Sequence, residues 1–147
     1  MTATPLQPTA RTVAVGSRQI HLSEFGAGVP VLMLHGGGPG ASGLSNYSRN
    51  VEALAHRFRV LVPDMPGYGK STKGIAADDP FGDIAAAMLG MLDALDIERA
   101  HVVGNSLGGA VALRMALDET QRVGRVVLMG PGGIGISQGK PTDGLQR

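Results

Sequence analysis

The sequence predicts an α/β fold in which a mostly parallel β-sheet carries helices on both faces. Short apolar runs alternate along the chain with segments whose apolar residues recur at helical spacing. Glycine-rich stretches follow several of the apolar runs, as turns at the ends of strands do. The chain has 147 residues, of which 43% are hydrophobic and 17% charged, so it can bury the core of one such domain.

The chain is expected to begin with a loose lead-in, an antiparallel hairpin and a buried strand. Residues 1–10 are polar and contain prolines, which favours the lead-in. Segments 11–15 and 19–23 alternate moderately in polarity on either side of a Gly-Ser pair, which indicates a hairpin. Residues 30–35 form a continuous apolar run that ends at glycines, as expected of a strand buried on both faces.

Helices and strands are expected to alternate over the rest of the chain. The longest helix should start at Asp79-Pro80, because aspartate caps a helix and proline fits its first turn. Right-handed crossovers between parallel strands place the carboxyl ends of the strands at one edge of the sheet, where the loops build a site. In order, the elements are a helix over 46–56, a strand over 58–62, a helix over 81–95, a strand over 100–104, a helix over 107–117 and a strand over 125–129.

Residues 104–108, with the sequence GNSLG, connect a predicted strand to a predicted helix and are here called the serine turn. Their pattern is G-x-S-x-G, in which glycines two residues before and after a serine let strand and helix pass closely. Such a turn presents the Ser106 hydroxyl at the sheet edge, and the helix N-terminus directs free N–H groups to a developing oxyanion. The alternative is a glycine-rich turn with a capping serine. The flanking strand and helix favour Ser106 as a nucleophile.

Residues 35–41, with the sequence HGGGPGA, follow the first parallel strand and are here called the glycine loop. Stabilising an acyl oxyanion takes two backbone donors, one from the residue after the serine and one from such a loop. Glycine allows the close approach that a backbone donor needs. We therefore expect the glycine loop and the serine turn to meet at one edge of the sheet.

The glycine loop also fits a dinucleotide-binding fingerprint, because G-x-G-x-x-A over 36–41 lies between a strand and a helix. Asp64, at the end of the next strand, would then bind the ribose. Pro39 argues against this interpretation, since it removes an N–H from the turn that would face the phosphates. A nucleotide-binding Rossmann domain is therefore kept only as an alternative, because it also leaves the serine turn unexplained.

Composition argues against several classes of partner and site. The formal net charge is +1 and no Lys/Arg cluster suggests a basic groove, so nucleic acid is not an expected partner. Cysteine is absent, which removes disulfides and thiolate metal sites and fits a cytoplasmic protein. No apolar run approaches the roughly 20 residues of a membrane span, and no signal peptide is recognisable. We expect no metal, no cofactor and no membrane partner.

Four motifs together resemble the N-terminal half of the α/β-hydrolase fold: HGGGPGA, DMPGYGKS, VVGNSLGG and LMGPGG. The resemblance implies that residues 11–133 are the N-terminal part of a hydrolase core and that residues 134–147 begin a lid region, cut short. HGGGPGASGLSNYSRN together with GNSLGG is similar to the meta-cleavage product hydrolases. Those enzymes break a carbon–carbon bond in 2-hydroxy-6-oxo-dienoates during the degradation of aromatic rings and steroids. Proline iminopeptidases carry a related HGGPG loop and stay a rival.

The resemblance implies roles for residues of the glycine loop, the serine turn and the segment between them. On the residues alone, Asn105 also fits a turn residue with left-handed φ, and Asn46 fits a helix cap. Many relatives have tryptophan where this chain has Leu44, so the pocket wall is expected to differ. The implied roles are Ser106 as the catalytic serine, Gly37 and Leu107 as backbone N–H donors to the oxyanion, and Gly38, Asn46 and Asn105 as substrate-binding residues.

The family orders its catalytic triad as serine, then an acid, then a histidine. Asp118 and Glu119 follow Ser106 but lie at the far end of its helix, about 15 Å away. Asp143 lies in the terminal tail, and no histidine follows Ser106. His35 is expected to support the glycine loop through the backbone. The other histidines, expected in the hairpin, at a helix end and in a strand, are His21, His56 and His101. We therefore expect the chain to lack the triad Asp and His and to be inactive alone.

The sequence thus predicts a hydrolase with a serine nucleophile and a small-molecule substrate. The favoured reaction is carbon–carbon cleavage of dienoate ring-fission products. An esterase or a proline iminopeptidase-like hydrolase is the nearest alternative, and a truncated binding protein without catalysis is the alternative from another class. A homo-oligomer of the full-length form stays open.

Overall fold

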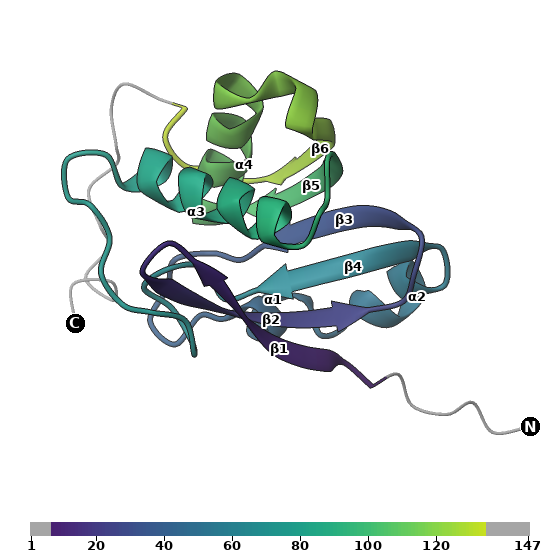
Figure 1. Ribbon diagram of the computed structural model, residues 1–147. Helices are drawn as coiled ribbons and strands as arrows, with labels where there is room; N and C mark the ends of the chain where they lie inside the picture. Colours follow the sequence, from purple (N-terminus) through teal and green to yellow (C-terminus); the bar gives the residue numbers. More distant parts are fainter. Residues whose placement is uncertain (1–6, 135–147) are drawn as a thin grey trace, which may run out of the picture.

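The computed structural model describes residues 7–134, which form a single six-stranded sheet with helices on both faces (Figure 1). Neighbouring strands follow the order β1-β2-β4-β3-β5-β6. The predicted α/β class is confirmed. The expectations for residues 1–6 and for the lid region from residue 135 onward lie outside the described residues.

β1 (Thr9–Val15) and β2 (Arg18–Phe25) form the predicted antiparallel hairpin. Both strands are longer than expected, and β1 includes the last two residues of the predicted lead-in. Gly16 occupies the turn with φ +58°, a left-handed conformation that glycine adopts without strain. β2 also pairs antiparallel with β4 (Phe58–Pro63), so the hairpin extends the sheet on one side.

The remaining strands lie parallel to one another, as predicted. β3 (Val29–Leu34) lies between β4 and β5 (Ala100–Asn105), and β6 (Val123–Met129) forms the outer edge. Each strand lies within a few residues of its predicted range. Because these strands run in the same direction, their carboxyl ends meet at one edge of the sheet.

The single helix predicted over 46–56 is wrong, because the chain forms α1 (Gly43–Tyr47) and α2 (Val51–Ala55) instead. α1 starts early because Ser42 and Ser45 form a capping box. The buried Tyr47 hydroxyl donates to the Leu34 carbonyl at 2.7 Å, and burial raises the Tyr47 pKa to about 12. Serine and asparagine in the next three residues are poor inside a helix, and the chain turns there.

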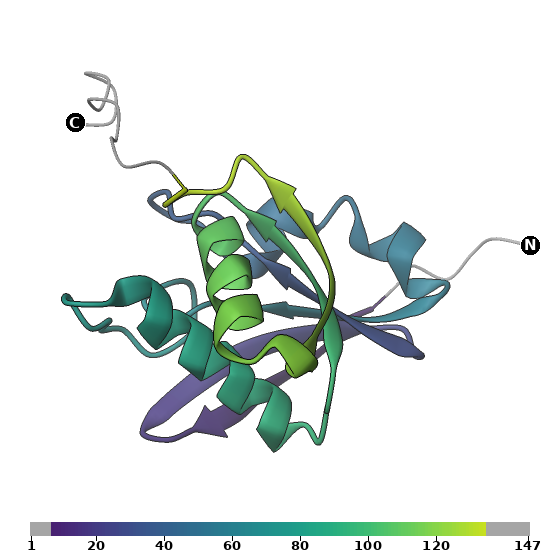
Figure 2. The same cartoon turned by 90° about the horizontal axis from the view of Figure 1, so that it is seen from above.

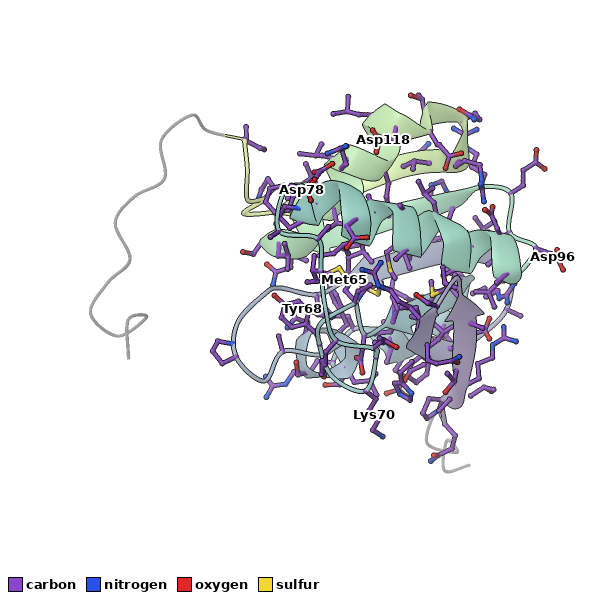
Figure 3. The ribbon with its side chains drawn as sticks, turned by 60° about the vertical axis from the view of Figure 1, so that its left-hand side comes forward. Met65, Tyr68, Lys70, Asp78, Asp96 and Asp118 are labelled. Atoms are coloured by element: carbon purple, nitrogen blue, oxygen red, sulfur yellow. The ribbon has the colours of Figure 1, made fainter. Side chains whose placement is uncertain are left out.

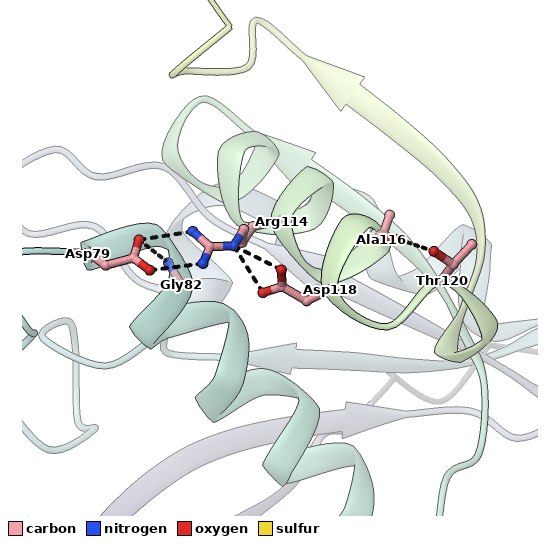
Figure 4. Close-up of polar contacts among 6 residues, drawn as sticks. All are labelled: Asp79, Gly82, Arg114, Ala116, Asp118 and Thr120. Atoms are coloured by element: carbon pink, nitrogen blue, oxygen red, sulfur yellow. Dashed lines mark hydrogen bonds and ion pairs between the residues drawn. The ribbon is translucent and has the colours of Figure 1, made fainter.

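α3 (Pro80–Ala94) and α4 (Leu107–Asp118) pack together on the other face of the sheet, as Figures 1 and 2 show. The predicted cap is confirmed, since the Asp79 side chain accepts from the Gly82 N–H. The Arg114 guanidinium of α4 joins the two helices by binding Asp79, the N-cap of α3, and it also binds Asp118 within α4 itself (Figure 4). These bonds to Arg114 lower the pKa of Asp79. A short 3-10 helix, η1 (Thr120–Arg122), leads into β6.

Two apolar cores lie on the two faces of the sheet. The larger core packs α3 and α4 against the strands, and the smaller core lies under α1 and α2. Among residues 7–134, no helix is both long enough and apolar enough to cross a membrane. Fully buried side chains of the larger core include Leu22, Leu32, Leu61, Met88, Leu92 and Met115.

Candidate active site

The glycine loop and the serine turn meet where β3 and β5 end, as predicted. An added Cβ at Gly37 would lie 3.0 Å from Cδ2 of Leu107, and one at Gly36 would lie 3.5 Å from Nδ2 of Asn105. These separations correspond to direct contact between the two loops. The structure therefore brings together the nucleophile candidate and both backbone donors that the sequence indicated.

Ser106 sits in a strained backbone conformation and is exposed. Its φ of 52° and ψ of −111° place it in a region that a non-glycine residue rarely occupies, at a cost of about 1–3 kcal/mol. Hydrogen bonds hold this conformation from several sides. The Ser106 N–H donates to the Met129 carbonyl at 2.9 Å, and the Ser106 carbonyl accepts from Gly109 at 2.9 Å and from Gly132 at 3.0 Å. The last residues of β6 and the loop after it thus brace the serine turn.

The two glycines of the G-x-S-x-G pattern are required by close packing. An added Cβ at Gly104 would lie 2.7 Å from Cα of Gly109, inside the first turn of α4. An added Cβ at Gly108 would lie 2.7 Å from the His35 carbonyl oxygen, on the neighbouring strand end. Real Cβ atoms do not approach so closely, so β5 and α4 can cross here only with glycine at both positions.

Two backbone donors next to the serine are unused within the described residues. Among residues 7–134, no protein acceptor pairs with the N–H of Gly37 or with that of Leu107. Leu107 is the first residue of α4, where N–H groups lack a partner inside the helix. The positive end of the α4 dipole lies at Leu107, and the predicted role of both N–H groups as oxyanion donors stays a prediction.

His35 supports the glycine loop and is not placed as a base. Its ring is completely buried, its Nδ1 lies 2.7 Å from the Gly36 carbonyl, and its Nε2 accepts from the Met65 N–H at 3.0 Å. The Met65 N–H can only donate, so Nε2 is unprotonated and Nδ1–H is the donor to Gly36. Burial lowers the His35 pKa below its usual 6.5, which keeps the ring neutral. The predicted supporting role is confirmed.

Asn46 and Asn105 contact one another beside the serine turn. The Asn46 Oδ1 accepts from the Gly36 N–H at 3.0 Å and from the Asn105 Nδ2 at 2.9 Å. The cap of α1 is Ser42, so Asn46 is not a helix cap. Asn105 does not have a positive φ, so the interpretation of Asn105 as a turn residue with left-handed φ is also wrong. Both side chains are half-buried at the site, and their role in binding substrate stays a prediction.

Leu44 lies in α1 and packs against the smaller core. It is half-buried there, on the face of the sheet that α1 and α2 cover. Its predicted effect on the wall of the substrate pocket stays untested.

Sequence reasoning did not identify Tyr68, which lies on the segment after β4 together with Met65 and Lys70 (Figure 3). The Tyr68 hydroxyl donates to the Gly37 carbonyl at 3.3 Å, and its ring meets the His35 ring edge-on at 5.1 Å between centroids. Tyr68 also lines a pocket of about 490 Å³ together with residues 37–41, and Ser106 is not among the lining residues. The glycine-rich motif DMPGYGKS after a parallel strand was the available signal.

The Asp64 carboxylate binds backbone N–H groups of two separate segments. It is buried, and its carboxylate accepts from the Gly43 N–H at 2.8 Å and from the Lys70 N–H at 3.0 Å. These bonds tie the start of α1 to the segment after β4. A carboxylate occupied in this way is not available to a ribose, which weakens the dinucleotide-binding alternative.

No histidine or carboxylate of residues 7–134 is hydrogen-bonded to the Ser106 hydroxyl. Asp118 is held by Arg114 (Figure 4), and Glu119 ends α4. Asp143 lies outside the described residues. Of the other histidines, His101 accepts from the Arg125 N–H at 2.8 Å, His56 ends α2, and His21 lies in β2. The part of the chain that the structure describes also holds no group of three or more His, Asp or Glu side chains suited to a metal ion.

Curated relatives support the hydrolase resemblance. The chain is 52% identical over 125 residues to a 2-hydroxy-6-oxo-6-phenylhexa-2,4-dienoate hydrolase of Burkholderia cepacia, covering 84% of this chain and 43% of that protein. It is 47% identical over 132 residues to a 2-hydroxy-6-oxononadienedioate/2-hydroxy-6-oxononatrienedioate hydrolase of Comamonas testosteroni, covering 87% and 46%. The chain therefore spans about half the length of the curated relatives it matches.

Solved structures agree with this fold. A serine hydrolase from the polyaromatic hydrocarbon-degrading bacterium Cycloclasticus zankles superposes with a TM-score of 0.85 at 34% identity, over 94% of this chain and 50% of that one. The 2-hydroxy-6-oxo-6-phenylhexa-2,4-dienoate hydrolase of Rhodococcus sp. strain RHA1 gives a TM-score of 0.81 at 32% identity, over 86% and 47%. The family model described as the alpha/beta hydrolase fold matches residues 29–145. The chain therefore belongs to the α/β-hydrolase fold family.

Proposed function

We propose that this chain carries the nucleophile half of a serine-dependent hydrolase that cleaves a carbon–carbon bond in 2-hydroxy-6-oxo-dienoate ring-fission products. The observation that carries the proposal is the exposed, strained Ser106 beside two unused backbone donors. Relatives at about half sequence identity that are named as dienoate hydrolases supply the substrate class.

In this proposal the Ser106 hydroxyl is the attacking or proton-transferring group of the site. Negative charge that develops on the substrate carbonyl is stabilised by the N–H groups of Gly37 and Leu107. Both donors belong to backbone that packing and hydrogen bonds already hold, so little reorganisation accompanies the reaction. The proposal requires a histidine and an acid from outside residues 7–134 to complete the triad.

The two asparagines provide polar contacts for an anionic substrate. The Asn46 oxygen is already occupied by two donors, so Asn46 can offer a substrate only its N–H groups. Those groups suit the carboxylate or the oxo group of a dienoate. Asn105 keeps its own oxygen free within the described residues and can accept from an enol hydroxyl.

Kinetics on the product of the complete reading frame test the proposal. Turnover of 2-hydroxy-6-oxo-6-phenylhexa-2,4-dienoate should exceed that of p-nitrophenyl acetate and of proline p-nitroanilide when kcat/KM values are compared. Preference for the ester would identify an esterase, and preference for the anilide a proline iminopeptidase-like enzyme. A complete frame with no histidine after Ser106 would contradict the proposal and favour a non-catalytic binding protein.

A further inference from the structure

We propose that Asn46 is a positioning residue that couples the glycine loop to the serine turn through a single amide oxygen. This inference rests on the proposed function, in which both loops act on the same substrate carbonyl. It differs from a role in substrate binding, which would use the N–H groups of Asn46 and leave the loops unaffected.

The orientation of both amides follows from one backbone group. The Gly36 N–H can only donate, so the Asn46 atom facing it at 3.0 Å is the oxygen. The Asn105 atom that faces the same oxygen at 2.9 Å must then be its nitrogen. Gly36 immediately precedes Gly37, and Asn105 immediately precedes Ser106. One oxygen therefore joins the neighbour of an oxyanion donor to the neighbour of the nucleophile.

The bond to Gly36 bears on the direction of the Gly37 N–H. That N–H belongs to the planar peptide whose carbonyl is Gly36 O, and His35 holds this carbonyl at 2.7 Å. Asn46 holds the N–H of the same glycine residue. With both sides of Gly36 fixed, this glycine loses the backbone freedom that it would otherwise have. The Gly37 donor is thereby aimed relative to Ser106.

Asn46 is itself mounted on a fixed support. It lies in α1, whose start is held by the Gly43 N–H bond to Asp64 at 2.8 Å. The next residue, Tyr47, is buried and donates to the Leu34 carbonyl at 2.7 Å, at the end of β3. α1 is therefore tied to β3 and to the segment after β4. An anchored helix can hold the separation of the two loops.

Two substitutions separate positioning from substrate binding. Asn46→Ala removes the oxygen and leaves both donors without their partner. Asn46→Asp keeps an oxygen that accepts from Gly36 and Asn105, but it removes the N–H groups and adds a negative charge. A neutral ester such as p-nitrophenyl acetate has no carboxylate, so it reports on the oxyanion donors and the nucleophile alone.

Ester and dienoate kinetics on the product of the complete reading frame provide the first test. Asn46→Ala should lower kcat/KM for p-nitrophenyl acetate about 10- to 100-fold, because a small misplacement of a reacting group has effects of this size. Asn46→Asp should restore most of the ester activity but not the dienoate activity, since its charge repels the anionic substrate. Ester kcat/KM unchanged in Asn46→Ala would overturn the inference.

Amide hydrogen exchange of the 147-residue chain provides a second test that needs no activity. In Asn46→Ala the Gly36 N–H should exchange about tenfold faster or more, and Asn46→Asp should return it toward the wild-type rate. Protection of the Leu32 amide in the central strand β3 shows that each variant is folded. Gly36 exchange that does not respond to Asn46→Ala contradicts the coupling. A wild-type enzyme without turnover would refute the proposed function, while the exchange rates would still decide the inference.

Discussion

The serine turn and the outer face of β6 are neighbouring regions that differ in packing. The serine turn is closely packed and hydrogen-bonded, whereas the outer face of β6 is open within residues 7–134. Around Ser106, its own N–H and carbonyl are paired within the chain, and the side chains of His35 and Asn46 hold the glycine loop through backbone groups of Gly36. Along β6, Val127 and Met129 are 54% and 41% exposed, and the outer edge of the strand has no partner among residues 7–134. A pocket of about 370 Å³, lined in part by Met33, Val103 and Met129, adjoins the same strand.

If a further segment completes the proposed hydrolase site, we expect it to pack on this face of β6. Exposed apolar side chains and an open strand edge are typical of a surface that another segment covers. β6 also supplies the Met129 carbonyl that accepts from the Ser106 N–H, so its end reaches the nucleophile. A segment that packs on β6 would therefore arrive beside the serine turn. In Figure 2, β6 lies on the outside of the sheet next to α4.

The largest effect is expected from Gly108→Ala, which adds a side chain in the closely packed serine turn. The added Cβ would collide with the Leu34 and His35 backbone, so strand and helix must separate. The free energy of unfolding should fall by about 3 kcal/mol or more, measured by urea denaturation. Gly132→Ala is the matched control, because its Cβ would meet nothing closer than 3.8 Å. Equal stability of the two variants would show that the turn is not closely packed.

A smaller effect is expected from Val127→Lys, which places a charge on the exposed face of β6. In the 147-residue chain it should reduce self-association in sedimentation experiments, because it replaces exposed apolar surface with charge. In the product of the complete reading frame it should cost about 2 kcal/mol, since the lysine would lie under a covering segment. Thr12→Lys, on the exposed side of the opposite edge strand β1, is the control and should change neither quantity. A stable complete product with Val127→Lys would mean that this face stays open.

The smallest effect is expected from lowering the pH, which should reduce stability through His35, the residue that supports the glycine loop. Because the His35 pKa is lowered in the folded chain, the unfolded chain takes up a proton first as the pH falls below about 6.5. The free energy of unfolding should therefore decrease below that pH, by at most about 1.4 kcal/mol per pH unit, until the folded-state pKa is reached. His35→Gln should flatten this dependence in urea denaturation between pH 7 and pH 5. The same slope in both proteins would place its origin elsewhere.

Local pattern was enough to predict the strands, the long helices and the serine turn. The G-x-S-x-G pattern reports a steric requirement, and the structure shows why Gly104 and Gly108 cannot carry a side chain. The roles of Tyr68 and Asp64 depend on contacts with the glycine loop and α1, which the sequence around them does not encode. The break between α1 and α2 was missed although Ser48 and Asn50 are poor inside a helix, and the hydrogen bond that holds Tyr47 to Leu34 just before the break is a tertiary contact that local pattern does not show.

Ser106 is proposed to be a nucleophile that needs a base from outside residues 7–134. The most direct test of this role is covalent labelling with a fluorophosphonate probe, with the adduct mapped by mass spectrometry. Labelling of the product of the complete reading frame should map to Ser106 and disappear in Ser106→Ala. The 147-residue chain, folded but without a later histidine, should react orders of magnitude more slowly. An adduct on another residue, or equally fast labelling of the 147-residue chain, would contradict this account.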